Sequence, residues 1–411
     1  MSERPDDVQI AYIGSVSERI RIPSRTRVVI VGGGPAGSLL AHLLHREGID
    51  CVVLELRTRE YVLGRIRAGV IEQGIADLLR EAGVGYRMDS EGFRHDGVNL
   101  AFDNRMFRVD FDALTGRHVV IYGQTELQKD LYGVLDREGV TFVDEAADLT
   151  LERVEGLTLE VSFSNGGARH TIDADFVVGC DGFHGVTRSY IPTDRLTTFE
   201  KVYPFTWVGI LSETAPVRDE LIYTNHDRGF ALCSMRNENL SRYYVQGKIE
   251  DTVEDWSDDR FWDELSTRLP EEAASDLITG PSIEKSITPL RSWVSEPLSY
   301  GRLFLAGDAA HIVPPTGAKG LNLAISDVVY LHDAFKHFYT TGSTTGLDGY
   351  SDRALARVWK AVRFSWWMTN TMHRVSDDGF DRRLQHVELE YLEGSENARR
   401  TMAENYVGLE I

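Results

Sequence analysis

The chain has 411 residues, 42% of them hydrophobic and 26% charged, an ordinary composition for a globular protein with room for two or three domains. Its formal net charge of −20 argues against nucleic acid or an anionic membrane as a partner, because both would repel it. If the substrate is an anion, its site must be built from locally placed arginines.

The cysteines and the lack of long apolar runs favour a cytoplasmic protein. Cys51, Cys180 and Cys233 are odd in number and lack metal-ligand spacing, so we predict neither a disulfide framework nor a metal site. No run reaches the roughly 18 apolar residues of a membrane span. The first residues carry charges and no signal-peptide core, so we expect residues 1–25 to be an N-terminal extension.

The first predicted strand, 28–31, runs into a glycine-rich turn and a helical pattern of leucines. In that turn Gly32 allows the chain to reverse, Gly34 allows the backbone to approach a pyrophosphate, and Gly37 allows the helix to pack against the strand. Glu55 follows the next apolar run, where an acid would bind a ribose hydroxyl. The pattern predicts a dinucleotide site, with plain chain reversal as the alternative.

Two later segments have the same form, an apolar strand that ends in small residues and one carboxylate. They are residues 175–182, with Asp181, and residues 303–311, with Asp308. Either aspartate taken singly could be only a helix cap. Together with the glycine turn, the segments predict a bed for one flavin dinucleotide.

The rest of the chain divides by its periodicity. We predict a helix over 124–138, a hairpin over 157–178 that turns at Asn165-Gly166, strands over 221–235 and 241–248, and a helix over 261–269. The last hundred residues are predicted to be mainly helical, over 321–338 and 352–373. An aromatic stripe in this region is expected to serve core or subunit packing: Trp359, Phe364, Trp366 and Trp367.

Two predicted strands in the middle of the chain carry unusually many polar side chains. Residues two apart share a face of a strand, so Ser234 and Arg236 point the same way, as do Arg242, Tyr244 and Gln246. If the strands pair, Arg236 can hold a carboxylate in a two-point fork with help from neighbouring hydroxyls. A solvated sheet face is the alternative.

Several longer segments, residues 61–70, 222–223, 228–234, 314–322 and 403–409, carry a more specific likeness. With the flavin segments, they make the chain from about Arg27 to Leu409 resemble the single-component flavoprotein aromatic hydroxylases that act on 4-hydroxybenzoate. The resemblance implies FAD as cofactor, with NADH or NADPH as cosubstrate. It also implies hydroxylation of 4-hydroxybenzoate to 3,4-dihydroxybenzoate (protocatechuate) with O₂ through a flavin C4a-hydroperoxide, and a homodimer.

The same resemblance assigns roles around the substrate. Ser234, Arg236 and Tyr244 would bind the carboxylate. Tyr223 and the carbonyl of Pro315 would contact the phenolic oxygen. Tyr406 would continue a proton relay that reaches solvent near His95, a residue that on its own would be read as a surface histidine.

For the cofactors, the resemblance implies two sets of contacts. The FAD contacts would be Gly32, Gly34, Ala36, Gly37, Glu55, Arg65, Arg67, Gln124, Asp181, Arg242, Asp308, Lys319, Gly320, Leu321 and Asn322. The nicotinamide contacts would be Arg67, His184, Arg188 and Arg291. Leu56, on a helix expected over 56–61, replaces an arginine common in NADPH-dependent members, so we predict that NADH is used. Compensation by Arg57 and Arg59, which would let NADPH serve as well, stays open.

The implied fold is α/β (α+β), with a Rossmann-like FAD-binding domain, an inserted mixed β-sheet substrate domain and a helical C-terminal region. We expect a discontinuous FAD domain of residues 26–95, 120–182 and 290–335. The substrate domain would comprise 96–119 and 183–289, and the helical interface region 336–411. Two other functions stay open: hydroxylation of a related acid such as 4-aminobenzoate, and flavin binding without hydroxylation.

Overall fold

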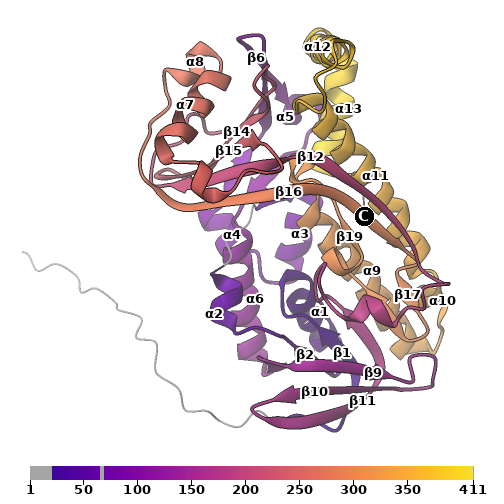
Figure 1. The fold of residues 1–411 in the computed structure, drawn as a ribbon. Helices are drawn as coiled ribbons and strands as arrows, with labels where there is room; N and C mark the ends of the chain where they lie inside the picture. Colours follow the sequence, from indigo (N-terminus) through magenta and orange to yellow (C-terminus); the bar gives the residue numbers. More distant parts are fainter. Residues whose placement is uncertain (1–20, 65–68, 411) are drawn as a thin grey trace, which may run out of the picture.

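The computed structural model describes residues 21–64 and 69–410. These residues form a mixed α/β structure with two eight-stranded sheets and one three-stranded sheet, which confirms the predicted fold class. Figure 1 shows the first sheet at one end of the molecule, the second at the other, and the C-terminal helices along one side of both.

The first sheet has a parallel centre, as expected for an α/β dinucleotide layer. Its strands, in spatial order, are β17 (Ser299–Tyr300), β18 (Leu303–Leu305), β11 (Ala168–Gly179), β1 (Arg25–Val31), β2 (Cys51–Leu54) and β8 (Thr141–Val143), while β10 (Leu159–Asn165) pairs with β11 and with β9 (Ala147–Glu152). The predicted hairpin is the antiparallel pair β10–β11.

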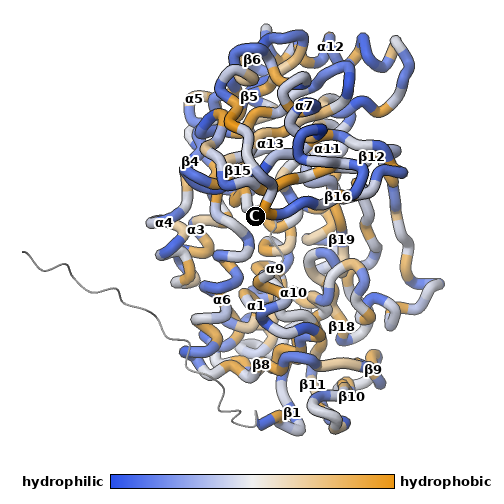
Figure 2. The backbone as a smooth tube through the Cα atoms, turned by 60° about the vertical axis from the view of Figure 1, so that its left-hand side comes forward, coloured by the Kyte–Doolittle hydropathy of each residue, from blue (hydrophilic) through white to orange (hydrophobic). Residues whose placement is uncertain are grey.

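Helices cover this sheet because their leucines recur at helical spacing. In α1 (Pro35–Arg46), Leu39, Leu40 and Leu44 are fully buried in the same core as β1. The other helices near the sheet are α2 (Arg59–Leu63), α3 (Gln73–Glu81), α4 (Tyr86–Glu91), α6 (Gln124–Glu138), α9 (Gly320–Thr341) and α10 (Thr345–Asp348). Figure 2 shows hydrophobic residues along these interior elements and hydrophilic residues mainly in outer loops. The helix expected over 56–61 begins only at Arg59, after the capping Thr58.

The second sheet combines two stretches of the chain that are far apart in sequence. Its order is β19 (His311–Ile312), β16 (Ser282–Glu296), β12 (Thr197–Ser212), β15 (Leu240–Gly247), β14 (Ala231–Asn237), β13 (Ile222–Thr224), β5 (Gly97–Phe102) and β6 (Arg105–Asp110). Helices α7 (Asp258–Arg268) and α8 (Glu271–Ala274) belong to the same region. The expected limit at residue 289 falls inside β16, so the domain limits stay a prediction.

Some elements differ from the sequence prediction. The strand predicted over 221–235 is interrupted, because residues 225–230 form a connection between β13 and β14. A small sheet of β3 (Val70–Glu72), β7 (Val119–Ile121) and β4 (Phe93–His95) was not predicted. Strands of three residues are too short to show a periodicity of their own.

The helical C-terminal region is confirmed as α11 (Tyr350–Met372), α12 (Gly379–Gly394) and α13 (Glu396–Val407), with α5 (Phe111–Thr115) packed against α13. The aromatic stripe of α11 divides between core and surface: Phe364 is buried, whereas Trp359 and Trp366 are 37% and 45% exposed. Within the described residues, no helix is long and apolar enough to cross a membrane.

Candidate active site

The three flavin segments of the sequence meet at the carboxyl ends of neighbouring strands. Gly179 at the end of β11 pairs with Val31 of β1 on one side and with Leu305 of β18 on the other. The backbone N–H of Ala306 donates to the Gly179 carbonyl at 2.9 Å. Ligands of open α/β sheets bind at this edge, so the segments are placed to hold one nucleotide.

The glycines of the first turn have separate reasons to be glycine. Gly32 has φ +107°, and a Cβ there would lie 2.3 Å from the Cys180 carbonyl oxygen. A Cβ on Gly37 would lie 1.9 Å from the Gly32 carbonyl oxygen. By contrast, a Cβ on Gly34 would meet no described atom within 4 Å, and Gly34 starts α1 without a side-chain cap. The space beside Gly34 and the uncapped N–H groups of α1 fit a pyrophosphate, whereas the protein itself does not require this glycine.

The acidic residues of the bed are also held by the backbone. Glu55 is 9% exposed and accepts from the N–H of Gly33 at 2.7 Å and from the N–H of Arg57 at 2.8 Å. Asp181 accepts from the N–H and the hydroxyl of Thr187, at 2.9 and 2.6 Å, and so caps a short turn. Burial raises the pKa of Asp181, and its bonds to Thr187 oppose that rise. The part-buried Asp308 lies in a one-turn 3₁₀ segment, Gly307–Ala309.

The segment 314–322, which also supplies predicted FAD contacts, opens α9. Gly320 is the first residue of this helix, which has no side-chain cap, and a Cβ on Gly320 would meet nothing within 4 Å. Lys319 donates to Glu72 at 2.6 Å and to the Tyr406 carbonyl at 2.9 Å. Asn322 accepts from the backbone N–H of Glu72 at 2.9 Å. Burial lowers the pKa of Lys319, which the Glu72 carboxylate opposes. Glu72 was missed in the sequence because no motif surrounds it.

Three further predicted cofactor contacts lie in the first turn of a helix, and two lie outside the described residues. Ala36 is buried in the first turn of α1, Gln124 is the first residue of α6, and Leu321 is part-buried in the first turn of α9. Arg65 and Arg67 lie outside the described residues.

The two polar strands pair, which is the condition for a shared polar face. β14 and β15 are antiparallel, with Ser234 opposite Arg242 and Leu232 opposite Tyr244. Ser234 is 7% exposed, and the Nε of Arg236 is buried without a hydrogen-bond partner among the described residues. Burial lowers the pKa of Arg236, and the adjacent Tyr244 opposes this. A buried guanidinium with an unsatisfied donor favours an anionic guest.

The Tyr244 ring has its place because the opposite residue on β12 is glycine. Gly209 pairs with Tyr244, and a Cβ there would lie 2.6 Å from the tyrosine ring. Trp207, two residues earlier on the same strand, packs on the Tyr244 ring at 4.8 Å between centroids. Sequence reasoning missed both residues. An isolated glycine within a strand pattern was the available signal, because it often marks a close approach.

Arg242 and Gln246 are bound mainly to other parts of the protein, and the Arg242 guanidinium also lies 5.2 Å from the centroid of the Tyr244 ring. Arg242 spans β12 to donate to Glu284 and Ser286, each at 2.9 Å. Gln246 donates to the Arg374 carbonyl at 2.8 Å. The polar residues of the two strands therefore divide into a potential carboxylate clamp and a set bound to the rest of the protein.

Tyr223 and Tyr406 form a buried pair, with 2.9 Å between their hydroxyl oxygens and 1% exposure each. Phe111 stacks on the Tyr406 ring at 4.9 Å. Burial and the neighbouring Tyr406 raise the pKa of Tyr223 well above its usual value. Burial raises the pKa of Tyr406 to about 12, and its bond to Tyr223 opposes the rise. Both phenols are therefore neutral at physiological pH.

The other two residues predicted at the phenol end, His95 and Pro315, differ in exposure. His95 is only 2% exposed, so its reading as a surface histidine is wrong: it lies in β4, a strand of the small sheet, which the sequence did not show. Both its ring nitrogens lack hydrogen-bond partners among the described residues. Burial lowers the pKa of His95 to about 4, against the opposing effect of Glu220. Pro315 is exposed, and its carbonyl accepts from the N–H of Ala318 at 2.9 Å.

The predicted nicotinamide residues that the structure describes, His184, Arg188 and Arg291, gather around one ring. Phe183 lies 5.0 Å from the His184 ring, and the guanidinium groups of Arg188 and Arg291 lie 5.3 and 5.0 Å from its centroid. Arg188 also lies 4.2 Å from the ring of Trp293. His184 is exposed, so this cationic and aromatic cluster is open on one side.

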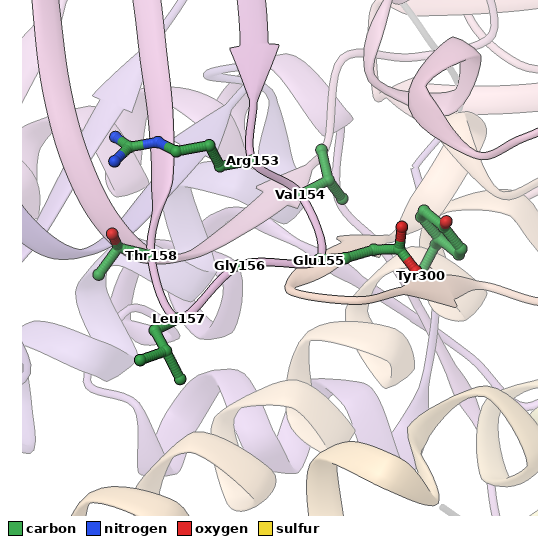
Figure 3. Close-up of a pocket in the computed structure, with 7 residues that line it drawn as sticks. All are labelled: Arg153, Val154, Glu155, Gly156, Leu157, Thr158 and Tyr300. Carbon is green, nitrogen blue, oxygen red and sulfur yellow. The ribbon is translucent and has the colours of Figure 1, made fainter.

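A hollow of about 650 Å³ lies elsewhere, at the turn between β9 and β10. Figure 3 shows its lining, in which Arg153 and Leu157 point away from each other and Glu155 lies beside Tyr300. None of the predicted site residues lines it. Among the described residues, no group of three His, Cys, Asp or Glu side chains could hold a metal ion.

The open space at Gly34 leads to a prediction. Gly34→Val is expected to leave the apoprotein folded, because Gly34 has φ −72° and no neighbour, and to weaken FAD binding roughly ten- to hundredfold, as about 1–3 kcal/mol of overpacking would. Fluorescence titration of the apoprotein with FAD and circular dichroism measure the two effects. Gly32→Val is the contrast, because it should destabilise the apoprotein itself. Normal FAD affinity in Gly34→Val would contradict the pyrophosphate site.

Comparisons with known proteins agree with this arrangement. The model of the FAD binding domain family matches residues 25–365. The chain is 52% identical over 387 residues to p-hydroxybenzoate hydroxylase of Acinetobacter baylyi, covering 94% of this chain and 96% of that one. It is 26% identical to a phenazine 1,6-dicarboxylic acid hydroxylase of Lysobacter antibioticus, over 75% and 82% of the two chains.

Among solved structures, p-nitrophenol 4-monooxygenase from Pseudomonas putida matches with a TM-score of 0.79 at 19% identity, covering 95% of this chain and 100% of that one. The shared fold, the nucleotide bed at the carboxyl ends of the strands and the close relative lead to one conclusion. The chain belongs to the FAD binding domain family and is a flavoprotein monooxygenase of the aromatic hydroxylase group, with FAD as its cofactor.

Proposed function

We propose that the protein hydroxylates 4-hydroxybenzoate to 3,4-dihydroxybenzoate, with NADH or NADPH and O₂ as cosubstrates. The observation that carries the proposal is that three successive strands, β13, β14 and β15, bring together the two ends of such a substrate's site. Tyr223 and its partner Tyr406 supply the phenol end, and Ser234, Arg236 and Tyr244 supply the acid end. The named activity of the 52% identical relative supports this choice.

At the acid end, Arg236 supplies a local positive charge in a protein that is negatively charged as a whole. The chain carries a net charge of −20, which repels an anionic acid in solution. Inside the site, the buried guanidinium offers charge-assisted hydrogen bonds, each worth about 1.5–3 kcal/mol, and the hydroxyls of Ser234 and Tyr244 add neutral ones. Exclusion of water strengthens these bonds.

At the phenol end, the two tyrosines move a proton without becoming charged themselves. Tyr223 accepts the proton of the substrate phenol as it passes its own proton to Tyr406, which passes one onward. The substrate oxygen is left as a phenolate, held by the Tyr223 hydroxyl and close to the Pro315 carbonyl. Because a phenolate donates electrons to its ring more strongly than a phenol, the carbon beside it becomes reactive toward an electrophilic oxygen. FAD, when bound, supplies the electron transfer from the nicotinamide and the activation of O₂.

His95 is proposed as the outer end of the relay. Its imidazole is buried with two unpartnered nitrogens, which calls for a water or another polar group beside it. Because burial lowers its pKa to about 4, it is neutral at physiological pH, and it would relay a proton by accepting one at one ring nitrogen as it gives one up at the other.

We also propose the cofactor contacts by position. The glycine turn with Ala36, Glu55, Asp181 and Asp308 would hold the nucleotide and ribityl parts of FAD, and the start of α9 with Lys319, Gly320, Leu321 and Asn322 would hold the flavin ring. Gln124 and Arg242 would be flavin contacts, although Arg242 is already bound to Glu284. His184, Arg188 and Arg291 would receive the nicotinamide, and Arg65 and Arg67 complete the two sets.

Product identification tests the proposed function. The purified holoenzyme is incubated in air with 4-hydroxybenzoate and either NADH or NADPH, and the products are separated by chromatography. We expect 3,4-dihydroxybenzoate in near-stoichiometric amount with the nucleotide consumed. Turnover of 4-aminobenzoate in its place would favour a related hydroxylase, and nucleotide oxidation without any aromatic product would favour a flavoprotein that does not hydroxylate.

The structure gives a further reason for the prediction that NADH is used. Leu56 is 55% exposed, and Arg59 is bound to Asp136 at 2.8 Å, so Arg59 does not replace a phosphate-reading arginine at 56. We expect NADH to be used at least as well as NADPH, and Leu56→Arg to raise kcat/KM for NADPH roughly tenfold, the effect of about one charge-assisted bond. Paired initial-rate assays measure both. A strict NADPH requirement of the unmodified protein would refute the prediction.

We propose a cytoplasmic homodimer, and α12 offers a surface for it. Phe380, Leu384, Val387 and Tyr391 are 69%, 52%, 43% and 58% exposed, and their spacing of four, three and four residues is that of a coiled-coil seam. In an antiparallel pair of these helices, Arg383 of one copy would face Glu390 of the other.

Leu384→Asp is therefore expected to convert the dimer to monomers, because it places two like charges in the seam. Light scattering coupled to size exclusion measures the mass. Leu157→Asp, at an 86% exposed position on the β9–β10 turn, is the matched control. A monomeric unmodified protein, or an unchanged dimer in Leu384→Asp, would exclude this interface.

A further inference from the structure

A buried histidine behind the substrate site has both ring nitrogens engaged. His373 follows α11, is 0% exposed, and lies with Nε2 2.6 Å from the indole nitrogen of Trp207 and Nδ1 3.0 Å from the Thr369 carbonyl. An indole N–H can only donate, so Nε2 is the acceptor and Nδ1 carries the proton that it donates to Thr369. Burial lowers the pKa of His373 to about 3, so this neutral tautomer persists at working pH.

The histidine ring also lies within an aromatic stack that reaches both ends of the site. It is stacked between Phe205 and Phe230, at 4.6 and 4.2 Å between ring centroids. Phe230 in turn lies 6.1 Å from the ring of Tyr223. Trp207, held by the histidine, stacks on Phe230 at 5.1 Å and packs on Tyr244 at 4.8 Å.

The neighbouring turn of α11 contacts the third side of the site. The Thr369 hydroxyl donates to the Thr316 hydroxyl at 3.1 Å, next to Pro315. A Cβ on Gly317 would lie 2.6 Å from the Ser365 hydroxyl oxygen, so the turn at 315–317 packs closely on α11. The end of α11 thus joins the Pro315 turn to the sheet that carries Tyr223 and Tyr244.

We propose that His373 is a positioning residue for the aromatic-acid site, an inference that rests on the proposed function. Its hydrogen bond fixes the plane of the Trp207 indole, and that plane sets the ring of Tyr244 for the substrate carboxylate. Its stack on Phe230 sets the ring against which Tyr223 packs. The indole N–H needs a buried hydrogen-bond acceptor at this point. An apolar residue in place of His373 would leave that donor unpaired in the core.

The test compares His373→Leu, which removes the acceptor, with His373→Gln, which keeps an oxygen acceptor. Substrate affinity is measured on the holoenzyme from the change in flavin absorbance on addition of 4-hydroxybenzoate. We expect His373→Leu to weaken binding roughly tenfold, the lower part of the effect of an unsatisfied buried donor, and His373→Gln to stay within roughly threefold of the unmodified protein. FAD content should not change in either variant.

His42→Leu is the matched control, because His42 is also a buried histidine with both nitrogens bonded, to Glu138 and to the Ala82 carbonyl, but lies on α1. It should lose stability without losing substrate affinity. A merely structural role for His373 predicts the same outcome for His373→Leu, a lower Tm with unchanged affinity, and that outcome would overturn the proposal.

The same substitution is also made in the Trp207→Phe protein, where the hydrogen bond is already absent. In Trp207→Phe the indole donor is absent, so His373→Leu should add little further loss of affinity there. An equal loss in both backgrounds overturns the hydrogen-bond argument. If His373→Leu does not fold, Trp207→Phe alone decides: it should weaken binding of the acid roughly tenfold, and unchanged binding is contrary to the proposal.

The shape of the pH profile of kcat/KM gives an independent readout. Because His373 stays neutral, the profile of His373→Leu should keep the apparent pKa values of the unmodified protein at a lower magnitude. Loss of a pKa from the profile would show that His373 titrates and overturn its assignment as a positioning residue. Failure of the proposed function is distinguishable, because the unmodified protein itself would then neither bind nor hydroxylate 4-hydroxybenzoate.

Discussion

Tyr223→Phe is expected to bind 4-hydroxybenzoate and to allow nucleotide oxidation, yet to hydroxylate roughly 10²–10⁴ times more slowly, the usual contribution of general acid–base catalysis. The Tyr223 hydroxyl has the Tyr406 hydroxyl as its hydrogen-bond partner at 2.9 Å, and both are buried. Without it, the substrate phenol has no route for its proton and stays a weak electron donor. Product formed per nucleotide consumed is the measurement.

Tyr243→Phe is the matched control for this variant. Tyr243 is equally buried and is the neighbour of Tyr244 on β15, but it belongs to the core on the other face of the sheet. The Tyr243 hydroxyl donates to the Ala215 carbonyl at 3.5 Å on the other face of the sheet, so its removal should leave hydroxylation within roughly twofold of normal. Unimpaired hydroxylation by Tyr223→Phe would reject the phenolate role.

Arg236→Met is expected to weaken binding of 4-hydroxybenzoate roughly 10²–10⁴-fold, as the loss of about two charge-assisted hydrogen bonds requires. Methionine keeps much of the side-chain volume while removing the charge. The buried, unpartnered Nε of Arg236 makes this the site's main attraction for an anion in a chain whose net charge is −20. Equilibrium titration followed by flavin absorbance measures the change.

Two comparisons separate carboxylate binding from a structural effect. The neutral methyl ester of 4-hydroxybenzoate should bind the unmodified protein and Arg236→Met with similar, weak affinity, because it presents no carboxylate. Arg228→Met, at an exposed arginine that pairs with Glu264, should bind the acid normally. Equal losses for the acid and the ester in Arg236→Met would mean that Arg236 supports the fold and does not clamp the acid.

The residues of the candidate active site come from distant parts of the chain. Tyr406 reaches Tyr223 from α13, and Lys319 at the start of α9 donates to the Tyr406 carbonyl. A change that displaces the last helix would therefore disturb the proton relay and the flavin side of the site together. For this reason, variants of Tyr406 are a less selective test than Tyr223→Phe.

The sequence by itself determined the class of fold, the cofactor and the polar face of each of the two polar strands. Its strand–glycine–helix pattern and the alternation in 231–236 and 242–246 follow from local backbone geometry, which neighbouring residues specify. Both predictions are confirmed, as are the helix over 124–138 and the helical C-terminal region. The short strands β3, β4 and β7 were missed, because their pairing is decided by partners distant in sequence.

Only the tertiary structure decided which side chains of the site are free to bind a guest. Arg236 and Arg242 look alike in sequence, and the Nε of each is buried without a hydrogen-bond partner among the described residues, but the other guanidinium nitrogens of Arg242 donate to Glu284 and Ser286 on β16. The burial of His95 and the placement of His373 behind Trp207 likewise depend on elements far away in the chain. Periodicity fixes the face on which a residue lies, whereas burial, charge partners and hydrogen bonds are set by whatever element packs against that face.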